Sequence, residues 1–139
     1  MTETKVLDFS ENIAHHLLSG WSIPEAGHRW AEGLHSEVEF ISAPRKGISC
    51  TIHCHPFAVQ SGEQQRMKVF LNSSFLEELA LQSDKKSYRL SLPKPQLKNG
   101  TNRLRFEFAY ARSPREMKAS VDARKLSVMF KKIAFHGLG

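Results

Sequence analysis

Long apolar runs are missing from this sequence of 139 residues. None approaches the roughly 20 residues that a helix needs to cross a bilayer, so no transmembrane segment is predicted. The first five residues, Met1 to Lys5, also lack the basic and then apolar pattern of a signal peptide. We therefore expect a cytoplasmic protein, or a domain cut from a larger chain.

Cysteine is scarce. The chain has two, Cys50 and Cys54. On a strand they would share one face but lie about 13 Å apart along it. A disulfide requires Cα atoms within roughly 7 Å, so these two residues are not expected to pair. The pattern predicts two buried thiols in a reduced protein.

Short motifs that signal catalysis are absent as well. The sequence has no Gly-x-Ser-x-Gly elbow, no glycine-rich phosphate loop and no Gly-x-Gly-x-x-Gly fingerprint. Adjacent carboxylates such as Glu77 and Glu78 would point to opposite sides of a strand. We expect a protein that is not an enzyme and needs no cofactor. Carboxylates that the fold alone brings together are the alternative.

The histidines give only a weak sequence signal for a metal site. His53 and His55 would lie on one side of a strand about 6.6 Å apart, which suits zinc or copper. A third ligand would have to come from His28, His35 or His136, and no Cys/His cluster with established metal-ligand spacing is present. The sequence predicts surface histidines and no metal.

What the sequence does have is alternation. Hydrophobic residues are 40% and charged residues 24% of the chain, which is ordinary for a soluble globular protein. Its length of 139 residues predicts a single domain, residues 1–139. Apolar side chains recur at every second position between turns, which is typical of half-buried strands. The residues expected on inner faces are Ile48, Cys50, Ile52, Cys54, Met67, Val69, Leu71, Tyr88, Leu90, Leu92, Asn102, Leu104, Phe106, Phe108, Tyr110, Leu126, Val128 and Phe130. Lys131 and Lys132 interrupt the last strand and indicate a bulge.

These short strands and frequent turns predict an all-β fold, an antiparallel jelly-roll β-sandwich of two sheets. One short N-terminal helix is also expected, with Ser10 as its N-cap and Gly20 at its end. Ile13, Leu17 and Leu18 fall on one helical stripe. The segment from Phe75 to Leu81 fits either a strand or a short helix.

Several short motifs follow one another between about Leu17 and Phe135. They are Gly20-Trp21-Ser22, Pro24-Glu25, Arg29-Trp30, Val69-Phe70-Leu71-Asn72, Tyr88-Arg89-Leu90-Ser91-Leu92-Pro93, Gly100-Thr101-Asn102-Arg103-Leu104-Arg105-Phe106, Ser113-Pro114 and Asp122-Ala123-Arg124-Lys125-Leu126-Ser127-Val128. Their order resembles β-sandwich accessory domains of bacterial polysaccharide-related proteins, such as membrane glycosyltransferases, phosphoglycerol transferases and sulfatase-like enzymes. The resemblance implies a galactose-binding-like jelly roll that is non-catalytic, faces a glycan and serves a larger polysaccharide-processing protein.

Both tryptophans lie in the stretch from Gly20 to Trp30, which we expect to anchor the start of the sandwich. Asp122 and Arg124 stand at the expected start of the last strand and would point inward. An unpaired buried charge is costly, so they need partners. We predict a charge network with Glu25 and Arg29 that is either architectural or borders a ligand site.

Trp21 and Trp30 are candidate platforms for a sugar ring, whose axial C–H groups favour an aromatic face. Arg29 and Glu25 would bind hydroxyls through charged, often bidentate hydrogen bonds. Both tryptophans are alternatively core residues, and Trp30 is the better candidate because His28 and Arg29 precede it. The predicted function is a non-catalytic carbohydrate-binding or glycan-associated accessory module. Its expected ligand-binding residues are Trp30, Arg29, Glu25, Trp21, Asp122 and Arg124.

The net charge of +6 favours anionic partners. The basic residues expected on outward strand faces are Lys68, Arg89, Arg103, Arg105, Lys125, Lys131 and Lys132. If their strands adjoin, they would bind an acidic polysaccharide or, with Phe70, a single-stranded nucleic acid. The alternatives are a solvated surface and a structural or protein-interaction sandwich that uses this face for contact. Nucleic acid is the least favoured partner.

Overall fold

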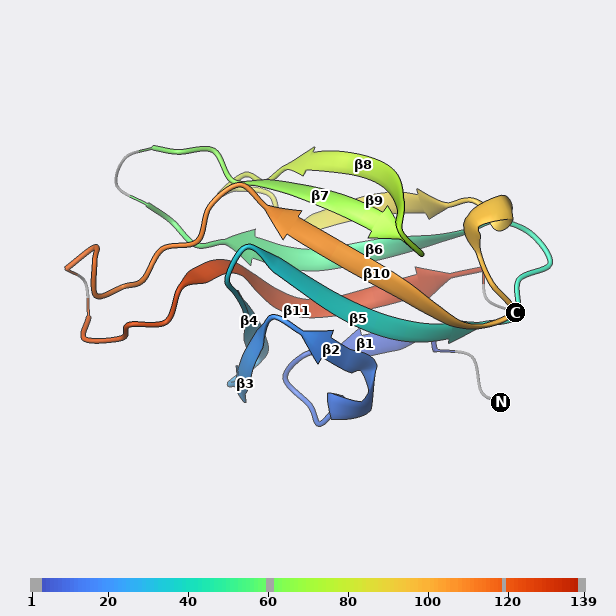
Figure 1. The fold of residues 1–139 in the computed structure, drawn as a ribbon, viewed down its shortest axis with the longest axis horizontal. Coiled ribbons are helices and arrows are strands. Elements are labelled where there is room, and N and C mark those ends of the chain that lie inside the picture. Colours follow the sequence, from blue (N-terminus) through green and yellow to red (C-terminus); the bar gives the residue numbers. More distant parts are fainter. Residues whose placement is uncertain (1–3, 60–61, 119, 138–139) are drawn as a thin grey trace.

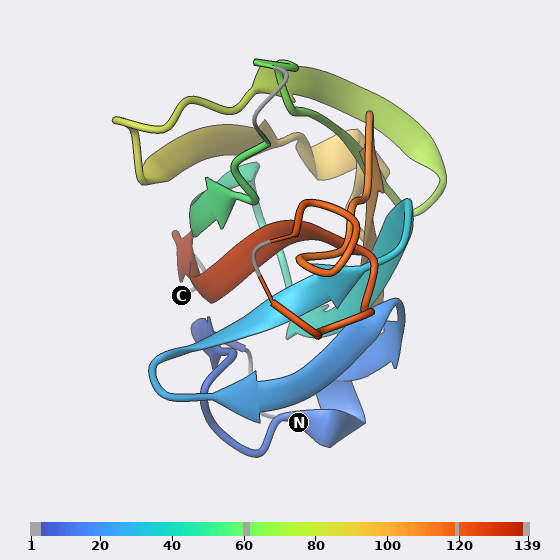
Figure 2. The same ribbon diagram turned by 90° about the vertical axis from the view of Figure 1, so that its left-hand side faces the viewer.

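Two antiparallel sheets packed face to face make up the computed structural model, which describes residues 4–59, 62–118 and 120–137 (Figures 1 and 2). Sheet A runs in the order β3-β4-β11-β6-β9, and β1 also pairs with β11. Its strands are β1 (Val6–Asp8), β3 (Trp21–Glu25), β4 (His28–Glu32), β6 (Ile48–Pro56), β9 (Ser87–Leu92) and β11 (Leu126–His136). Sheet B runs in the order β2-β5-β10-β7-β8. Its strands are β2 (Leu17–Ser19), β5 (His35–Ser42), β7 (Arg66–Leu71), β8 (Ser74–Ala80) and β10 (Gly100–Phe108).

The core lies between the sheets and follows the alternation of the sequence. The eighteen alternating strand residues from Ile48 to Phe130 that were expected on inner faces are all buried, and this confirms the all-β sandwich. Phe106 of sheet B contacts Phe130 of sheet A with ring centroids 5.2 Å apart, and Phe9 contacts the same ring at 5.3 Å. Phe40 stacks on Phe135 at 4.5 Å. These aromatic contacts join the two sheets and add to the free energy gained from burying apolar area.

The N-terminal helix is shorter than the sequence predicts. It is a single 3-10 turn, η1 (Ala14–His16), and a second turn, η2 (Lys94–Gln96), precedes β10. Ser10 does not cap η1, because its N–H and hydroxyl both donate to the Asp8 carboxylate. The residues that follow η1 pair with β5 as strand β2. Pairing with a neighbouring strand therefore overrides the helical periodicity of this segment.

The remaining alternatives are settled as strand. The segment that fitted either a strand or a helix is β8, which pairs with β7. The bulge predicted in β11 is confirmed, because Phe130 is opposite Cys54 while Lys132 is opposite His53, so Lys131 is the extra residue. Within the described part of the chain, no helix is long and apolar enough to cross a membrane.

Both cysteines are free and buried on β6, as predicted. They lie in an inner strand of sheet A, between β11 and β9. Burial raises the pKa of the Cys50 and Cys54 thiols to about 12, because a thiolate would lose its hydration there. Both thiols are therefore expected to stay protonated near neutral pH.

Candidate functional site

The predicted tryptophan stretch forms an antiparallel hairpin of β3 and β4 at the edge of sheet A. Pro24 is tolerated in β3 because an edge strand leaves one side of its backbone unpaired. The alternation of β4 turns Arg29 and Ala31 inward and leaves His28, Trp30 and Glu32 on the outer side. The hairpin thus divides the predicted ligand-binding residues between the core and the surface.

Arg29 belongs to the core side of the hairpin. It is 7% exposed, and its guanidinium donates to the carbonyl oxygens of Phe9, Ser22 and Glu11 at 3.1, 3.1 and 3.2 Å. Burial lowers the pKa of this guanidinium because the charge is less well hydrated. The prediction that Arg29 joins Asp122 and Arg124 is wrong, since each of its three guanidinium nitrogens donates to a backbone carbonyl.

The Trp21 side chain is partly buried and packs against the core. Its ring packs between Phe9 and Phe130, with centroids 4.8 and 5.0 Å away. Its indole N–H donates to the carbonyl of Glu37 at 2.9 Å, which ties β3 of sheet A to β5 of sheet B. The core alternative therefore describes Trp21.

A chain of ion pairs crosses the tip of the hairpin. Arg124 contacts the Asp122 carboxylate at 2.7 Å and the Glu25 carboxylate at 3.5 Å. The other oxygen of Glu25 lies 3.0 Å from Nε2 of His28. The hydrogen bond from Arg124 lowers the pKa of Asp122, and the same bond raises that of Arg124. Three of the four residues in the predicted charge network, Glu25, Asp122 and Arg124, do meet.

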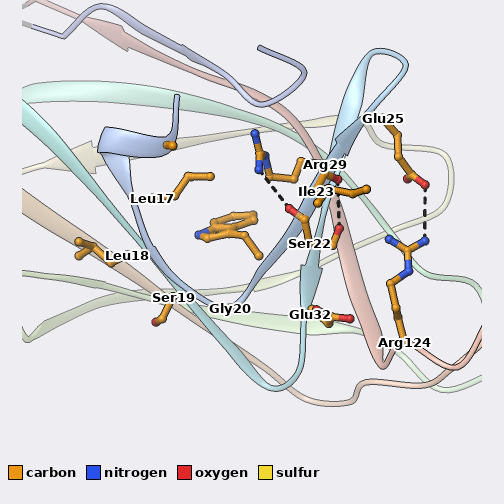
Figure 3. Close-up of a pocket in the computed structure, with 12 residues that line it drawn as sticks. Leu17, Leu18, Ser19, Gly20, Ser22, Ile23, Glu25, Arg29, Glu32 and Arg124 are labelled. Atoms are coloured by element: carbon orange, nitrogen blue, oxygen red, sulfur yellow. Dashed lines mark hydrogen bonds and ion pairs between the residues drawn. The ribbon is translucent and has the colours of Figure 1, made fainter. Parts of the chain in front are cut away.

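The position of Asp122 and Arg124 differs from the prediction. Strand β11 begins at Leu126, so both residues precede it and are partly exposed. The Asp122 carboxylate accepts the backbone N–H of Arg124 at 3.0 Å, which folds this segment into a turn. The side chains therefore meet above the hairpin tip, where Figure 3 shows Glu25 and Arg124 facing one another.

Trp30 lies half-buried on the outer face of sheet A, with its backbone opposite Met129 of β11. The His28 ring meets it edge-on at 6.1 Å, and the Phe57 ring does so at 5.7 Å. His28 in turn contacts Glu25, so the indole adjoins the chain of ion pairs. The structure thus brings Trp30, Glu25, Asp122 and Arg124 into one outer cluster, here called the Trp30 cluster, together with His28 and Phe57.

Phe57 and His28 were not predicted as site residues. The position of Phe57 is fixed because its N–H donates to the carbonyl of Ser127 and its carbonyl accepts the hydroxyl of Tyr110 at 2.7 Å. Phe57 follows the last residue of β6, outside the alternation, so its sequence position carried no signal. His28 did carry one, because a residue two before Trp30 on a strand faces the same side.

An open groove of about 900 Å³ runs beside the same hairpin (Figure 3). Its walls come from β2, β3, Glu32 and Arg124, and they include Trp21, Glu25 and Arg29. Leu18 and Ile23 line it with exposures of 40% and 75%, so part of the wall is apolar. Glu25 and Arg124 border both this groove and the Trp30 cluster.

The metal candidates do not converge. Among the described residues, no three His, Cys, Asp or Glu side chains are grouped so as to hold a metal ion. The two ring nitrogens of His55 lie 3.0 Å from the carbonyl oxygens of Pro56 and Ser83, and Nε2 of His136 lies 2.9 Å from the Thr51 hydroxyl. These imidazoles therefore make contacts with the protein's own backbone and side chains.

The basic residues do not form one patch. Lys68, Arg103 and Arg105 are on sheet B, whereas Arg89, Lys131 and Lys132 are on sheet A. Lys125 precedes β11 and pairs with Glu116 at 2.9 Å, which lowers the pKa of that carboxyl.

On sheet B the arginines are neutralised by carboxylates. Arg103 lies 3.5 and 3.9 Å from Glu37 and Glu39, and Arg105 lies 2.9 and 3.0 Å from Glu37 and Glu107. Phe70 is opposite Arg105 on the neighbouring strand. The face that combines arginine with an aromatic ring is therefore poorly suited to a polyanion.

Comparison with known proteins identifies the class of fold. No protein-family model matches the chain, and no curated protein matches its sequence. Among solved structures it is similar to a family 35 carbohydrate-binding module from an environmental isolate, with 14% identity, 100% of this chain and 87% of that chain covered, and a TM-score of 0.52. It is also similar to the C-terminal CBM6 of LamC, a marine laminarinase from Zobellia galactanivorans, with 10% identity, coverage of 95% and 99%, and a TM-score of 0.56. The fold is thus a β-sandwich of the kind found in carbohydrate-binding modules.

The same sandwich occurs inside larger enzymes. A GH115 4-O-methyl-α-glucuronidase with specificity for decorated arabinogalactans matches 81% of this chain at 11% identity and a TM-score of 0.55. The chain spans 14% of the length of that enzyme. The fold alone is shared at these identities.

Proposed function

We propose that this chain is a non-catalytic carbohydrate-binding module whose ligand rests on the Trp30 cluster. The observation that carries the proposal is an outward tryptophan held edge-on by His28 and Phe57, beside ion-paired Glu25 and Arg124. An outward aromatic ring that is already immobilised loses little conformational entropy when a ligand stacks on it. The sandwich fold shared with carbohydrate-binding modules agrees with this use.

In this proposal the apolar C–H face of a sugar ring stacks on the indole, and the polar neighbours bind hydroxyls. Carboxylate and guanidinium groups make stronger hydrogen bonds than neutral ones, so Glu25, Arg124 and Asp122 supply orientation. Trp21 and Arg29 have a supporting role in this proposal. Their contacts with Phe9 hold in place the hairpin that carries Trp30. The predicted ligand-binding set therefore divides into four surface residues and two supporting ones.

The proposed setting is a larger polysaccharide-processing protein. The resemblance to accessory domains of glycosyltransferases, phosphoglycerol transferases and sulfatase-like enzymes supports this setting, as does the small share of the glucuronidase that the sandwich spans. In that setting the module would hold a partner domain near its glycan.

A glycan array tests the proposal, with wild type, Trp30→Ala and Phe75→Ala compared. Phe75 is a 55% exposed aromatic residue on β8 of sheet B, so its removal is a matched control. We expect wild type and Phe75→Ala to bind one glycan class selectively, and Trp30→Ala to bind it about tenfold more weakly, a loss of roughly 1.4 kcal/mol. Circular dichroism and thermal unfolding establish that each variant is folded.

Two results would count against this function. One is a folded wild type that binds no neutral or acidic glycan, and the other is equal binding by Trp30→Ala and wild type. The first would favour the second candidate, a protein-interaction sandwich. The exposed Leu18 and Ile23 in the groove beside β3 are the observation that supports this alternative.

A further inference from the structure

The outer face of sheet A carries a second cluster of polar groups, away from the β3–β4 hairpin. The bulge in β11 exposes both Lys131 and Lys132, because the extra residue breaks the alternation that would have turned one of them inward. Lys132 is opposite His53 of β6, and His53 is opposite Ser87 of β9. Three adjacent strands therefore contribute to one surface.

The same surface continues along these strands. Arg89 of β9 donates to the Ser49 hydroxyl at 3.1 Å, and the Thr51 hydroxyl lies 2.9 Å from Nε2 of His136. These side chains alternate with buried ones, so all of them face outward. We call this surface the β11–β6–β9 face; it is formed by Ser49, Thr51, His53, His55, Lys86, Ser87, Arg89, Lys131, Lys132 and His136.

A hollow of about 250 Å³ adjoins this face and is lined by Cys54, His55, Lys86, Met129 and Lys131. Both ring nitrogens of His55 lie 3.0 Å from carbonyl oxygens. The hollow is thus bordered by two ammonium groups and an imidazole.

The cations here lack the partners that cations on sheet B have. Among the described residues, no carboxylate lies within ion-pair distance of Lys86, Arg89, Lys131 or Lys132. On sheet B, by contrast, Arg66, Arg103 and Arg105 all pair with glutamates. Four cations without an ion-pair partner among the described residues are therefore gathered on this face.

Two acidic residues, Asp8 and Asp84, lie next to residues of this face in the strand pairing or in the sequence. Asp8 of β1 is opposite Lys132, but its carboxylate accepts the N–H and hydroxyl of Ser10. Asp84 stands in the turn before β9, two residues from Lys86. Four permanent cations and three imidazoles thus face two carboxylates.

His53 responds to this excess of positive charge. Burial lowers the pKa of its imidazole, and the charges of Lys132, His136 and Lys131 lower it further. A bound anion would offset those charges and favour the protonated ring, so anion binding would take up a proton. Affinity for an anion should therefore rise as the pH falls through the histidine range.

We propose that the β11–β6–β9 face binds an acidic polysaccharide, with its carboxylate or sulfate groups on Lys131, Lys132, Lys86 and Arg89. An extended polyanion fits because the cations lie on β11, on β9 and just before β9, with β6 between the two strands, rather than around one point. Hydroxyls of Ser49, Thr51 and Ser87 lie between them to meet the sugar hydroxyls. Single-stranded nucleic acid fits less well, because it requires aromatic platforms for the bases and this face has none among its described residues. This site goes beyond the Trp30 cluster and does not depend on it.

Titration of the whole protein with sodium polygalacturonate tests the proposal, and fully methyl-esterified polygalacturonate serves as the uncharged probe. We expect binding of the charged polymer alone, with a loss of affinity as salt rises. The double variant Lys131→Gln with Lys132→Gln should bind about tenfold more weakly. The control Lys68→Gln with Lys98→Gln removes the same charge elsewhere and should stay within about twofold of wild type.

Three further comparisons decide the outcome. Wild type should bind more tightly at pH 5.5 than at pH 7.5, and His53→Gln should reduce that gain. Phe75→Ala, which removes an exposed aromatic ring from β8 of sheet B, should leave polygalacturonate affinity unchanged, because it lies outside this face. Equal loss in the two lysine double variants, equal binding of the esterified polymer, or tighter binding of oligo(dT) than of polygalacturonate would overturn the proposal.

Discussion

Arg29 shows how a single residue can appear functional in sequence and be structural in the fold. It stands beside Trp30 in a cluster that suggests a binding site, yet it is buried and donates to three backbone carbonyls from separate segments. Those carbonyls belong to Phe9 and Glu11 of the N-terminal segment and to Ser22 of β3. The guanidinium therefore joins the N-terminal segment to β3.

Replacing Arg29 by Met should destabilise the protein by about 3 kcal/mol, because the carbonyls lose charged donors while the side-chain length is kept. Urea unfolding followed by circular dichroism measures this change. The control Arg66→Met removes an exposed ion pair with Glu78 and should cost less than about 1 kcal/mol. Equal effects of the two substitutions would contradict the structural role assigned to Arg29.

The sequence indicates the side of the strand on which Trp30 lies more clearly than it indicates the partners of Arg29, and the ligand-binding role of Trp30 stays a prediction. Alternation alone places Trp30 on the opposite side of the strand from Arg29, and two residues from His28 on the same side. The contact with Phe57 was hidden because it depends on where the chain turns after β6. The partners of Arg29 could not be predicted, because every residue has a backbone carbonyl and the sequence does not show which ones lie near the guanidinium.

Gly20 lies at the point where the chain passes from sheet B to sheet A. Strand β2 belongs to sheet B and β3 to sheet A, and Gly20 is the one residue between them. Its φ is +81°, and an added Cβ would lie 2.1 Å from the carbonyl oxygen of His35. Its own carbonyl accepts the Ser36 hydroxyl and the N–H of Glu32, which fixes the crossing on both sides.

Gly20→Ala should therefore lower the free energy of unfolding by about 3 kcal/mol, through backbone strain and overlap with His35. Gly27→Ala is the matched comparison, because Gly27 has a φ of +80° but open space around its Cβ position. It should cost about 1 kcal/mol, from the backbone conformation alone. Unfolding midpoints in urea measure both, and similar values would show that close packing at Gly20 contributes little.

Among the elements, strands were predicted more reliably than the N-terminal segment. Strand alternation on β6 or β10 depends on which side of a sheet is buried, and that is written in the sequence itself. The segment around Ile13 and Leu17 satisfied a helical stripe too, because a short segment has too few residues to separate the two periods. Pairing with β5 decided it.

The whole molecule encloses its two thiols so that they report on global unfolding. Cys50 and Cys54 lie on an inner strand of sheet A under the aromatic core, with exposures of 0% and 2%. Their pKa of about 12 keeps them as unreactive thiols near neutral pH. Both side chains face the interior between the sheets, so we expect access to them to require opening of the sandwich.

We expect a disulfide reagent at pH 8 to label Cys50 and Cys54 at the same slow rate in the native protein. That rate should rise with urea in step with the loss of β-sheet signal, since both thiols become accessible in one cooperative transition. A control variant, Ser91→Cys, places a thiol on the exposed side of β9 and should react at once. Rapid native labelling, or labelling of one natural cysteine well before the other, would contradict this account.

The sequence by itself determined the all-β class, the inner faces of the strands, the β11 bulge and the reduced cysteines, because a strand's side chains alternate and each alternation is local. The tertiary structure decided which outward residues meet. It separated the arginines of sheet B, which glutamates neutralise, from Lys131 and Lys132 of sheet A, which have no ion-pair partner in the part of the chain that the structure describes. It also brought Arg124 to Glu25 across 99 residues of chain. Contacts of that kind arise from the order of the strands in each sheet, which alternation does not encode.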